Sequence, residues 1–157
     1  MVMIMKEAEI IALDGPFGVP VVSIPKTVPR DEVIMLGVIG ARRRNNKYDK
    51  LKVRNKILEM KPTVIVTGDA ARGGDKFARY FAERFGIKLV VYDADVDDGM
   101  TYQERVTEYY RRNKLIASTS THLFALVGKD RRGGTEYTIR QFKKTHRDWK
   151  KRLFLDE

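Results

Sequence analysis

From residue 33 onward, short continuous apolar runs alternate with segments of helical character, and this alternation restricts the fold more than any other feature. The runs VIMLGVIG, PTVIVTG, IKLVVYDAD and THLFALVG have the length of strands that are buried on both faces. Helical patterns follow them, over residues 48–60, 73–86, 101–116 and 134–144. Strands and helices in this order form parallel β-α-β units with right-handed crossovers. We therefore predict a Rossmann-like α/β sandwich of three layers, with a mostly parallel sheet of about five strands.

The pattern also predicts which face of the first helix is buried and where the last strand lies. In residues 48–60 the periodicity predicts a buried helix face made largely of four side chains, Tyr48, Leu51, Ile57 and Leu58. The closing RLFL has strand character and is predicted as the last strand of the sheet. A length of 157 residues is enough for one domain with a core of ordinary size.

Residues 1–30 differ in composition from the rest of the chain. They hold four of the five prolines, and EIIALDGPFGVPVVSI has the pattern of two short strands around a Gly/Pro turn. We predict an N-terminal β-hairpin or arm over residues 1–30, covering a sheet edge or a partner subunit, and a Rossmann-like domain over residues 31–157. Such an arm suits a homo-oligomer, although the number of subunits does not follow from the sequence.

The composition excludes several classes of protein. No apolar run approaches the roughly 20 residues of a membrane-spanning helix, and the apolar start is too short for a signal peptide, so we expect a cytoplasmic protein with no membrane partner. The chain has no cysteine, which excludes disulfides and thiolate chemistry, and its two histidines do not suffice for a structural zinc site. We predict no metal site, and we interpret the acidic loop over residues 93–100 as solvated rather than cation-binding.

The formal net charge of +10 is unevenly distributed. Residues 41–56 contain eight basic side chains and one acidic side chain, Asp49. This concentration of charge favours phosphate ligands, RNA or DNA, although a solvated basic surface explains it equally well. A second basic stretch, residues 143–152, contains Trp149, which is suited to stacking on a nucleic-acid base or, as we favour, to packing the C-terminal tail against the domain.

Glycine-rich or polar loops follow the predicted strands, and open parallel sheets bind ligands outside the carboxyl ends of their strands. In the first loop, Gly40 allows a sharp turn and Arg42 is suited to binding a phosphate. The second loop, TGDAARGGDKFA, ends a strand and opens a helix, whose first backbone N–H groups form an anion cradle. Asp75 is expected mainly to cap this helix. The candidate binding residues of the second loop are Thr67, Gly68, Arg72, Gly73, Gly74 and Asp75.

The loop GKDRRGGTEY repeats the arrangement of a strand end followed by a helix start. Its candidate binding residues are Gly128, Gly133, Gly134 and Thr135, and the Thr135 hydroxyl is suited either to capping the helix or to binding a phosphate. Two glycine-rich helix starts at one sheet edge predict a bipartite site for phosphate and ribose.

Taken in order, four motifs resemble the SLOG superfamily of Rossmann-like domains, in particular its YspA-like branch. They are Gly40-Ala41-Arg42, the loop from Gly68 to Asp75, the pair Arg112-Asn113 in the third helix, and Gly134-Thr135. The resemblance covers about residues 33–145. It implies a nucleotide-derived ligand and a position of Arg112 and Asn113 close to the site. From the residues alone, a surface Arg112 paired with Glu108 is an equally good interpretation.

Three functions follow from these observations and stay open. The loops and the resemblance favour a nucleotide-binding sensor or regulatory module, with a nucleotide or an ADP-ribose-like molecule as its ligand. LOG-type relatives cleave the N-glycosidic bond of nucleoside monophosphates, but Thr138 occupies the position of their assisting glutamate. A hydrolase would therefore need another carboxylate, for which the candidates are Asp75, Glu104 and Glu136. DprA-type relatives bind single-stranded DNA, which the basic stretches also favour.

Overall fold

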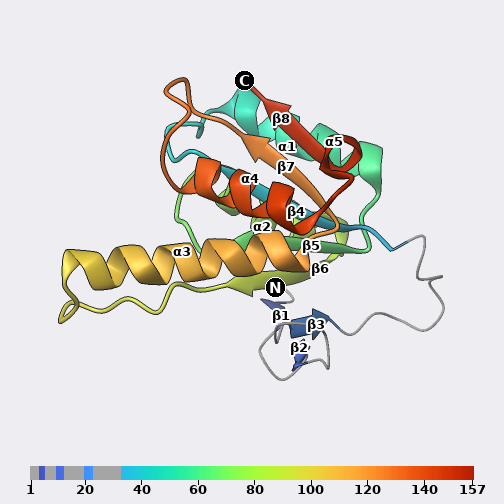
Figure 1. Ribbon diagram of the computed structural model, residues 1–157. Helices are drawn as coiled ribbons and strands as arrows, with labels where there is room; N and C mark the ends of the chain where they lie inside the picture. The colour runs from blue at the N-terminus through green and yellow to red at the C-terminus, as the bar shows by residue number, and fades with distance from the viewer. Residues whose placement is uncertain (1–3, 6–9, 13–19, 23–32) are drawn as a thin grey trace.

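The structure is a computed structural model that describes residues 4–5, 10–12, 20–22 and 33–157 (Figure 1). Its central feature is a six-stranded sheet in the order β1-β6-β5-β4-β7-β8, and every neighbouring pair of strands is parallel. The predicted α/β class with a parallel sheet is confirmed by β4 to β8, and the closing RLFL contributes β8. The strands are β1 (Ile4–Met5), β4 (Met35–Gly40), β5 (Val64–Gly68), β6 (Lys88–Tyr92), β7 (His122–Leu126) and β8 (Leu153–Asp156).

Two further short strands, β2 (Ile10–Ala12) and β3 (Pro20–Val22), pair with each other in antiparallel orientation. The predicted hairpin or arm over residues 1–30 falls largely on residues outside those described. It therefore stays a prediction.

Helices cover both faces of the sheet, which confirms the three-layer arrangement (Figure 1). The helices are α1 (Lys47–Met60), α2 (Gly74–Phe85), α3 (Tyr102–Thr119), α4 (Gly134–Thr145) and the short α5 (Trp149–Arg152). Side chains of α1 and α2 pack on one face of the sheet, and side chains of α3 and α4 pack on the other.

The strands lack an alternating polar pattern because both of their faces are buried. In β4, Met35 and Ile39 belong to the core beneath α3 and α4, whereas Leu36 and Val38 belong to the core beneath α1 and α2. Full burial of one such side chain contributes about 1.5–3 kcal/mol. This double burial explains why continuous apolar runs predicted the strands correctly.

The predicted buried face of α1 is largely wrong. Ile57 is buried as expected, but Tyr48, Leu51 and Leu58 are exposed, and the inward-facing residues are Asp49, Val53 and Ile57. The physical reason is that the buried face includes an acidic side chain, Asp49, which a pattern based on apolar residues leaves out. The Asp49 carboxylate takes part in a capping box with Asn46 and in an ion pair with Arg44, and these contacts set the rotation of the helix.

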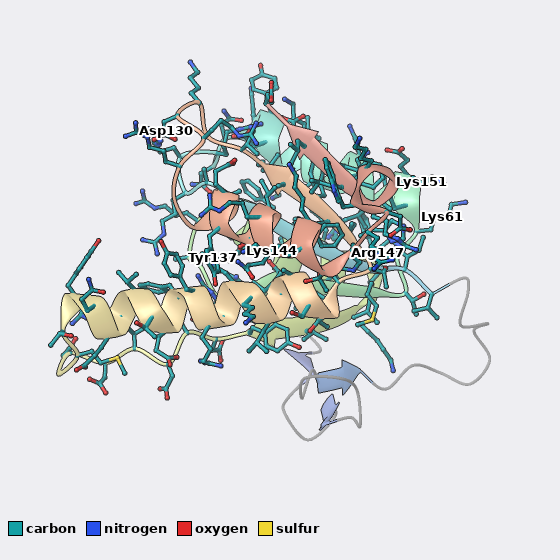
Figure 2. The ribbon with its side chains drawn as sticks, in the orientation of Figure 1. Lys61, Asp130, Tyr137, Lys144, Arg147 and Lys151 are labelled. Carbon is teal, nitrogen blue, oxygen red and sulfur yellow. The ribbon has the colours of Figure 1, made fainter. Side chains whose placement is uncertain are left out.

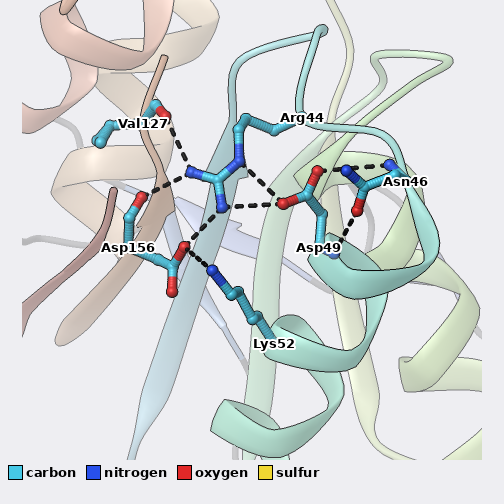
Figure 3. A network of polar contacts seen from close by, with 6 residues as sticks. All are labelled: Arg44, Asn46, Asp49, Lys52, Val127 and Asp156. Carbon is cyan, nitrogen blue, oxygen red and sulfur yellow. Dashed lines mark hydrogen bonds and ion pairs between the residues drawn. The ribbon is translucent and has the colours of Figure 1, made fainter. Parts of the chain in front are cut away.

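Arg44 joins the loop after β4 to the far edge of the sheet (Figure 3). Its guanidinium donates to the Asp49 carboxylate, to the Val127 carbonyl oxygen and to both the carbonyl and the carboxylate of Asp156, over distances of 2.5 to 2.9 Å. Lys52 donates to the same Asp156 carboxylate at 2.8 Å. Arg44 therefore connects α1, β7 and β8 and is a structural residue.

The strand order creates a crevice between β4 and β7. These two strands are neighbours, but α1 and α4, which follow them, lie on opposite faces of the sheet. At such a switch point the two connections diverge and leave a space at the carboxyl ends of the strands, which is where open α/β sheets bind ligands. Across the described residues, no helix is long and apolar enough to cross a membrane.

Candidate functional site

A cleft with a volume of about 400 Å³ lies at this switch point. Four parts of the chain line it: the end of β4 with its following loop, the loop after β5 with the first turn of α2, one face of α3, and the start of α4. Among the sequence-predicted binding residues, those that line the cleft are Gly40, Arg42, Asp75, Arg112, Asn113, Gly133, Gly134 and Thr135. Residues from loops that are distant in sequence thus meet at one place, as the rule for parallel sheets predicts.

The start of α4 opens into the cleft without a side-chain cap. Its N-cap residue is Gly133, which has φ +93° and supplies no side-chain acceptor to the first turn. Thr135 therefore does not cap the helix. A Cβ atom added at Gly133 would meet nothing within 4 Å, so the approach to these N–H groups is open. Such a helix start favours an anion through its N–H groups and its dipole.

The start of α2 has a different role, because its glycines are used for packing. A Cβ atom at Gly74 would lie 2.6 Å from the Ile39 carbonyl carbon and oxygen, and the Gly73 N–H donates to the Asn45 side chain at 2.9 Å. The residues lining the cleft include neither Gly73 nor Gly74. Of the two helix starts in the predicted bipartite site, that of α4 therefore lines the cleft through its glycines and that of α2 does not.

Of the remaining predicted residues of the second loop, Asp75 lines the cleft, whereas Thr67, Gly68 and Arg72 do not. The Thr67 hydroxyl is buried and donates to the Val38 carbonyl oxygen at 2.6 Å, while the Gly68 carbonyl accepts from Arg79 at 2.7 Å. Arg72 is exposed to solvent outside the cleft. Gly128 lines a second cavity of about 520 Å³, together with Arg44 and other residues.

Asp75 is a buried carboxyl group at the cleft, and the expectation that it caps α2 is wrong. The helix begins two residues earlier, at an N-cap formed by Gly73, because only glycine readily adopts the φ of +77° found there. The Asp75 carboxylate instead accepts from the Ala70 N–H at 3.3 Å. Burial raises the pKa of Asp75 to about 6, and the nearby guanidinium of Arg112 only partly opposes this effect.

Arg112 and Asn113 are both buried and both line the cleft. Arg112 forms an ion pair with Asp69, and its Nε donates to the Asn113 side-chain oxygen at 3.3 Å. The alternative of a surface Arg112 paired with Glu108 is wrong, since Glu108 pairs with Arg111 at 3.0 Å. The sequence analysis paired Glu108 with Arg112, whereas its partner in the structure is Arg111, one residue earlier.

An aromatic wall from α3 completes the cleft, and the sequence reasoning missed it. Tyr102, Val106, Tyr109 and Tyr110 lie on one side of the helix and line the cleft. The Tyr110 ring stacks on Tyr137 of α4 with 4.2 Å between ring centroids. The signal was present in the sequence, because apolar and aromatic residues recur every three to four positions ahead of Arg112-Asn113.

Besides Arg112, three arginines line the cleft, and they differ in their partners. Arg43 pairs with Asp130 at 2.8 Å, on the loop after β7. Within the described part of the chain, Arg42 and Arg132 form no ion pair. Their positive charges therefore remain available to an anionic ligand.

Of the three candidate catalytic carboxylates, only Asp75 lines the cleft. Glu104 is exposed and belongs to the capping box of α3 with Thr101. Glu136 pairs with Arg131 at 2.9 Å, and its buried Oε2 has no hydrogen-bond partner among the described residues. The described residues contain no group of three metal-ligating side chains, and the acidic loop is closed by the Gly99 N–H donating to Asp97 at 2.8 Å.

The two basic stretches are distributed over several environments. In residues 41–56, the ion-paired side chains are Arg43, Arg44, Lys52 and Lys56. In the second stretch, Trp149 packs against the core, and Lys143 covers its ring at 4.4 Å.

Comparison with known proteins finds no significant match to a protein-family model, a curated protein or a solved structure. The resemblance to the SLOG superfamily therefore stays a prediction.

Proposed function

We propose that the protein binds a nucleotide or a nucleotide-derived phosphate ligand in the cleft at the switch point, as a sensor or regulatory module. One observation carries the proposal. Two arginines without ion pairs, Arg42 and Arg132, line the same 400 Å³ cleft as the uncapped start of α4 and the tyrosine wall of α3. Cations and free N–H groups suit phosphate, and aromatic rings suit a base, so one small molecule that carries both groups fits this cleft.

The proposal is tested by calorimetric titration with mononucleotides, dinucleotides and ADP-ribose. Arg42→Ala and Arg132→Ala should each weaken binding of the tightest ligand about tenfold, the loss typical of one hydrogen bond to a charged group. Arg147→Ala is the matched control, because Arg147 is exposed and does not line the cleft, and in Figure 2 it lies on the other side of the domain from Asp130, the partner of Arg43. Absence of binding by the whole panel, or an equal loss in the control, would refute the proposal.

A second candidate function, hydrolysis of the bound nucleotide, is favoured by Asp75. A carboxyl group whose pKa is about 6 is suited to taking a proton from water near neutral pH. For an N-glycosidic bond, the water oxygen would bond to the sugar carbon as the C–N bond breaks. The proton taken by Asp75 would pass to the released nucleobase. Chromatography of the titrated samples tests this function. If wild-type protein releases no free base from any ligand that it binds, the hydrolase is excluded.

Binding of single-stranded nucleic acid has less support than a small ligand. Four of the eight basic side chains in residues 41–56 are neutralised by ion pairs, and Trp149 packs against the core beneath Lys143. A small phosphate ligand predicts a weak dependence of affinity on salt, whereas six to ten phosphate contacts would reduce affinity by about 10³–10⁵ between 50 and 200 mM salt. Titration of a short single-stranded DNA at these two salt concentrations separates the two cases.

A further inference from the structure

Three buried polar side chains form one part of the cleft lining, which we call the polar floor: Asp75, Arg112 and Asn113. Their exposed fractions are 6%, 7% and 7%. Asp75 and Arg112 lie next to each other across Gly68, where an added Cβ would come within 2.5 Å of the Asp75 carboxylate and 3.4 Å of the Arg112 guanidinium carbon. Arg112 in turn donates to Asn113. The three polar groups therefore form one continuous surface.

The polar floor has hydrogen-bonding capacity that the described residues do not use. Asp75 accepts one hydrogen bond there, from the Ala70 N–H to its Oδ2, and its Oδ1 accepts none. Arg112 uses its Nε and one terminal nitrogen, and its other terminal nitrogen donates to no described residue. The Asn113 amide nitrogen lies 3.5 Å from the Gly134 carbonyl oxygen, at the limit of a hydrogen bond. Among the described residues, Glu136 Oε2 is the only fully buried side-chain atom without a partner, so the unused atoms of the polar floor are accessible, and the cleft that they line presents them to a ligand.

The chemistry of the floor selects hydroxyl groups over phosphate. A hydroxyl both donates and accepts, which matches an acceptor on Asp75 beside donors on Arg112 and Asn113. A phosphate only accepts, and its negative charge would lie against the Asp75 carboxylate. The phosphates are therefore better placed at Arg42, Arg132 and the start of α4, where no carboxylate competes for the two arginines.

We propose that the polar floor binds the ribose hydroxyls of the nucleotide, so that the ligand lies with its sugar on Asp75 and its phosphates at the start of α4. This inference rests on the proposed function and adds to it a class of ligand, the ribonucleotides, and an orientation. Asp75 is then a specificity-determining residue that distinguishes ribose from sugars without the two hydroxyls.

The test compares each ribonucleoside diphosphate (ADP, GDP, CDP and UDP) with its 2′,3′-dideoxy counterpart and with inorganic pyrophosphate, by calorimetry. For the tightest ribonucleotide, the wild type should bind the dideoxy form at least about tenfold more weakly, since each lost hydrogen bond to a charged group is worth about that factor. In Asp75→Asn, which keeps the size of the side chain, this ratio should fall to within about threefold.

Pyrophosphate provides a readout of the orientation that is independent of the sugar. Its affinity should fall in Arg42→Ala and should stay equal or increase in Asp75→Asn, because only the former variant loses a phosphate contact. Equal binding of ribose and dideoxy forms by the wild type overturns the orientation and leaves nucleotide binding standing. Absence of binding by all nucleotides and by pyrophosphate overturns the proposed function and the orientation together. Circular dichroism of Asp75→Asn verifies that the variant is folded.

Discussion

Replacement of Asp75 by asparagine should stabilise the protein, and the gain should grow with pH. The folded state raises the pKa of Asp75 from 3.8 to about 6, chiefly through burial. Stability from this group is therefore fully present below pH 3.8, where both states are protonated, and is lost as pH rises through about 6. Above that pH the folded protein holds a buried charge that the unfolded chain hydrates freely. Asparagine has no such charge at any pH.

The size of the effect follows from the two pKa values. Their difference corresponds to about 3 kcal/mol, at 1.36 kcal/mol for each pKa unit, over the whole pH range. Between pH 5 and pH 8 about half of this amount, about 1.5 kcal/mol, is expected, because the unfolded carboxyl is already ionised at pH 5. The melting temperature of Asp75→Asn minus that of the wild type, measured by thermal unfolding, should therefore increase by about 3–6 °C from pH 5 to pH 8.

A matched control separates this effect from the general influence of pH. Asp98→Asn removes the same charge from an exposed position in the loop over residues 93–99. Its difference from the wild type should change little with pH. The reasoning is refuted if the difference between Asp75→Asn and the wild type is the same at pH 5 and pH 8. A confirmed result would mean that the chain keeps a costly carboxylate at the cleft, which is expected of a functional residue.

Three further predictions concern stability and are measured by urea denaturation. Arg44→Met should lower the free energy of unfolding by about 3 kcal/mol, because it removes the cation that Asp49 and Asp156 share. Ile57→Ala should cost about 3 kcal/mol, whereas Leu58→Ala, on the exposed side of α1, should change stability by less than about 0.5 kcal/mol; equal losses would contradict the buried face described above. Gly74→Ala should lower the free energy of unfolding by about 2 kcal/mol, because the added methyl group collides with the β4 backbone. Gly86→Ala should lower it by about 1 kcal/mol through the φ of +64° alone. An unchanged stability of Gly74→Ala would contradict the close packing of α2 on β4.

The strands were predictable from the sequence because their burial on both faces leaves an unambiguous local pattern. The face of α1 was not, because it depends on Asp49, whose inward position is stabilised by Arg44 and by the link from Arg44 to Asp156 more than 100 residues away. A periodicity that counts only apolar residues assigns an acidic side chain to solvent. An ion pair between distant segments has no signature in that periodicity.

The site was predictable to the level of which loops meet, since the carboxyl ends of parallel strands share one edge. The different roles of the two glycine-rich helix starts could not be predicted from the sequence. Both carry a Gly-Gly pair, yet a Cβ at Gly73 would lie 3.0 Å from the Ala41 carbonyl oxygen, whereas a Cβ at the equivalent Gly133 would meet nothing within 4 Å. Glycine is required equally by close packing and by a ligand approach, so its presence alone does not distinguish them.

The run Arg42-Arg43-Arg44 shows why the charge of a segment does not identify its ligand. Arg44 is used inside the protein, by the network that joins α1, β7 and β8. Arg43 is held at the surface by Asp130. Arg42 alone is left without a carboxylate partner among the described residues, and it lines the cleft. Half of the basic side chains in residues 41–56 thus form ion pairs within the fold, and the unpaired Arg42 at the cleft is the one that the proposed nucleotide site uses.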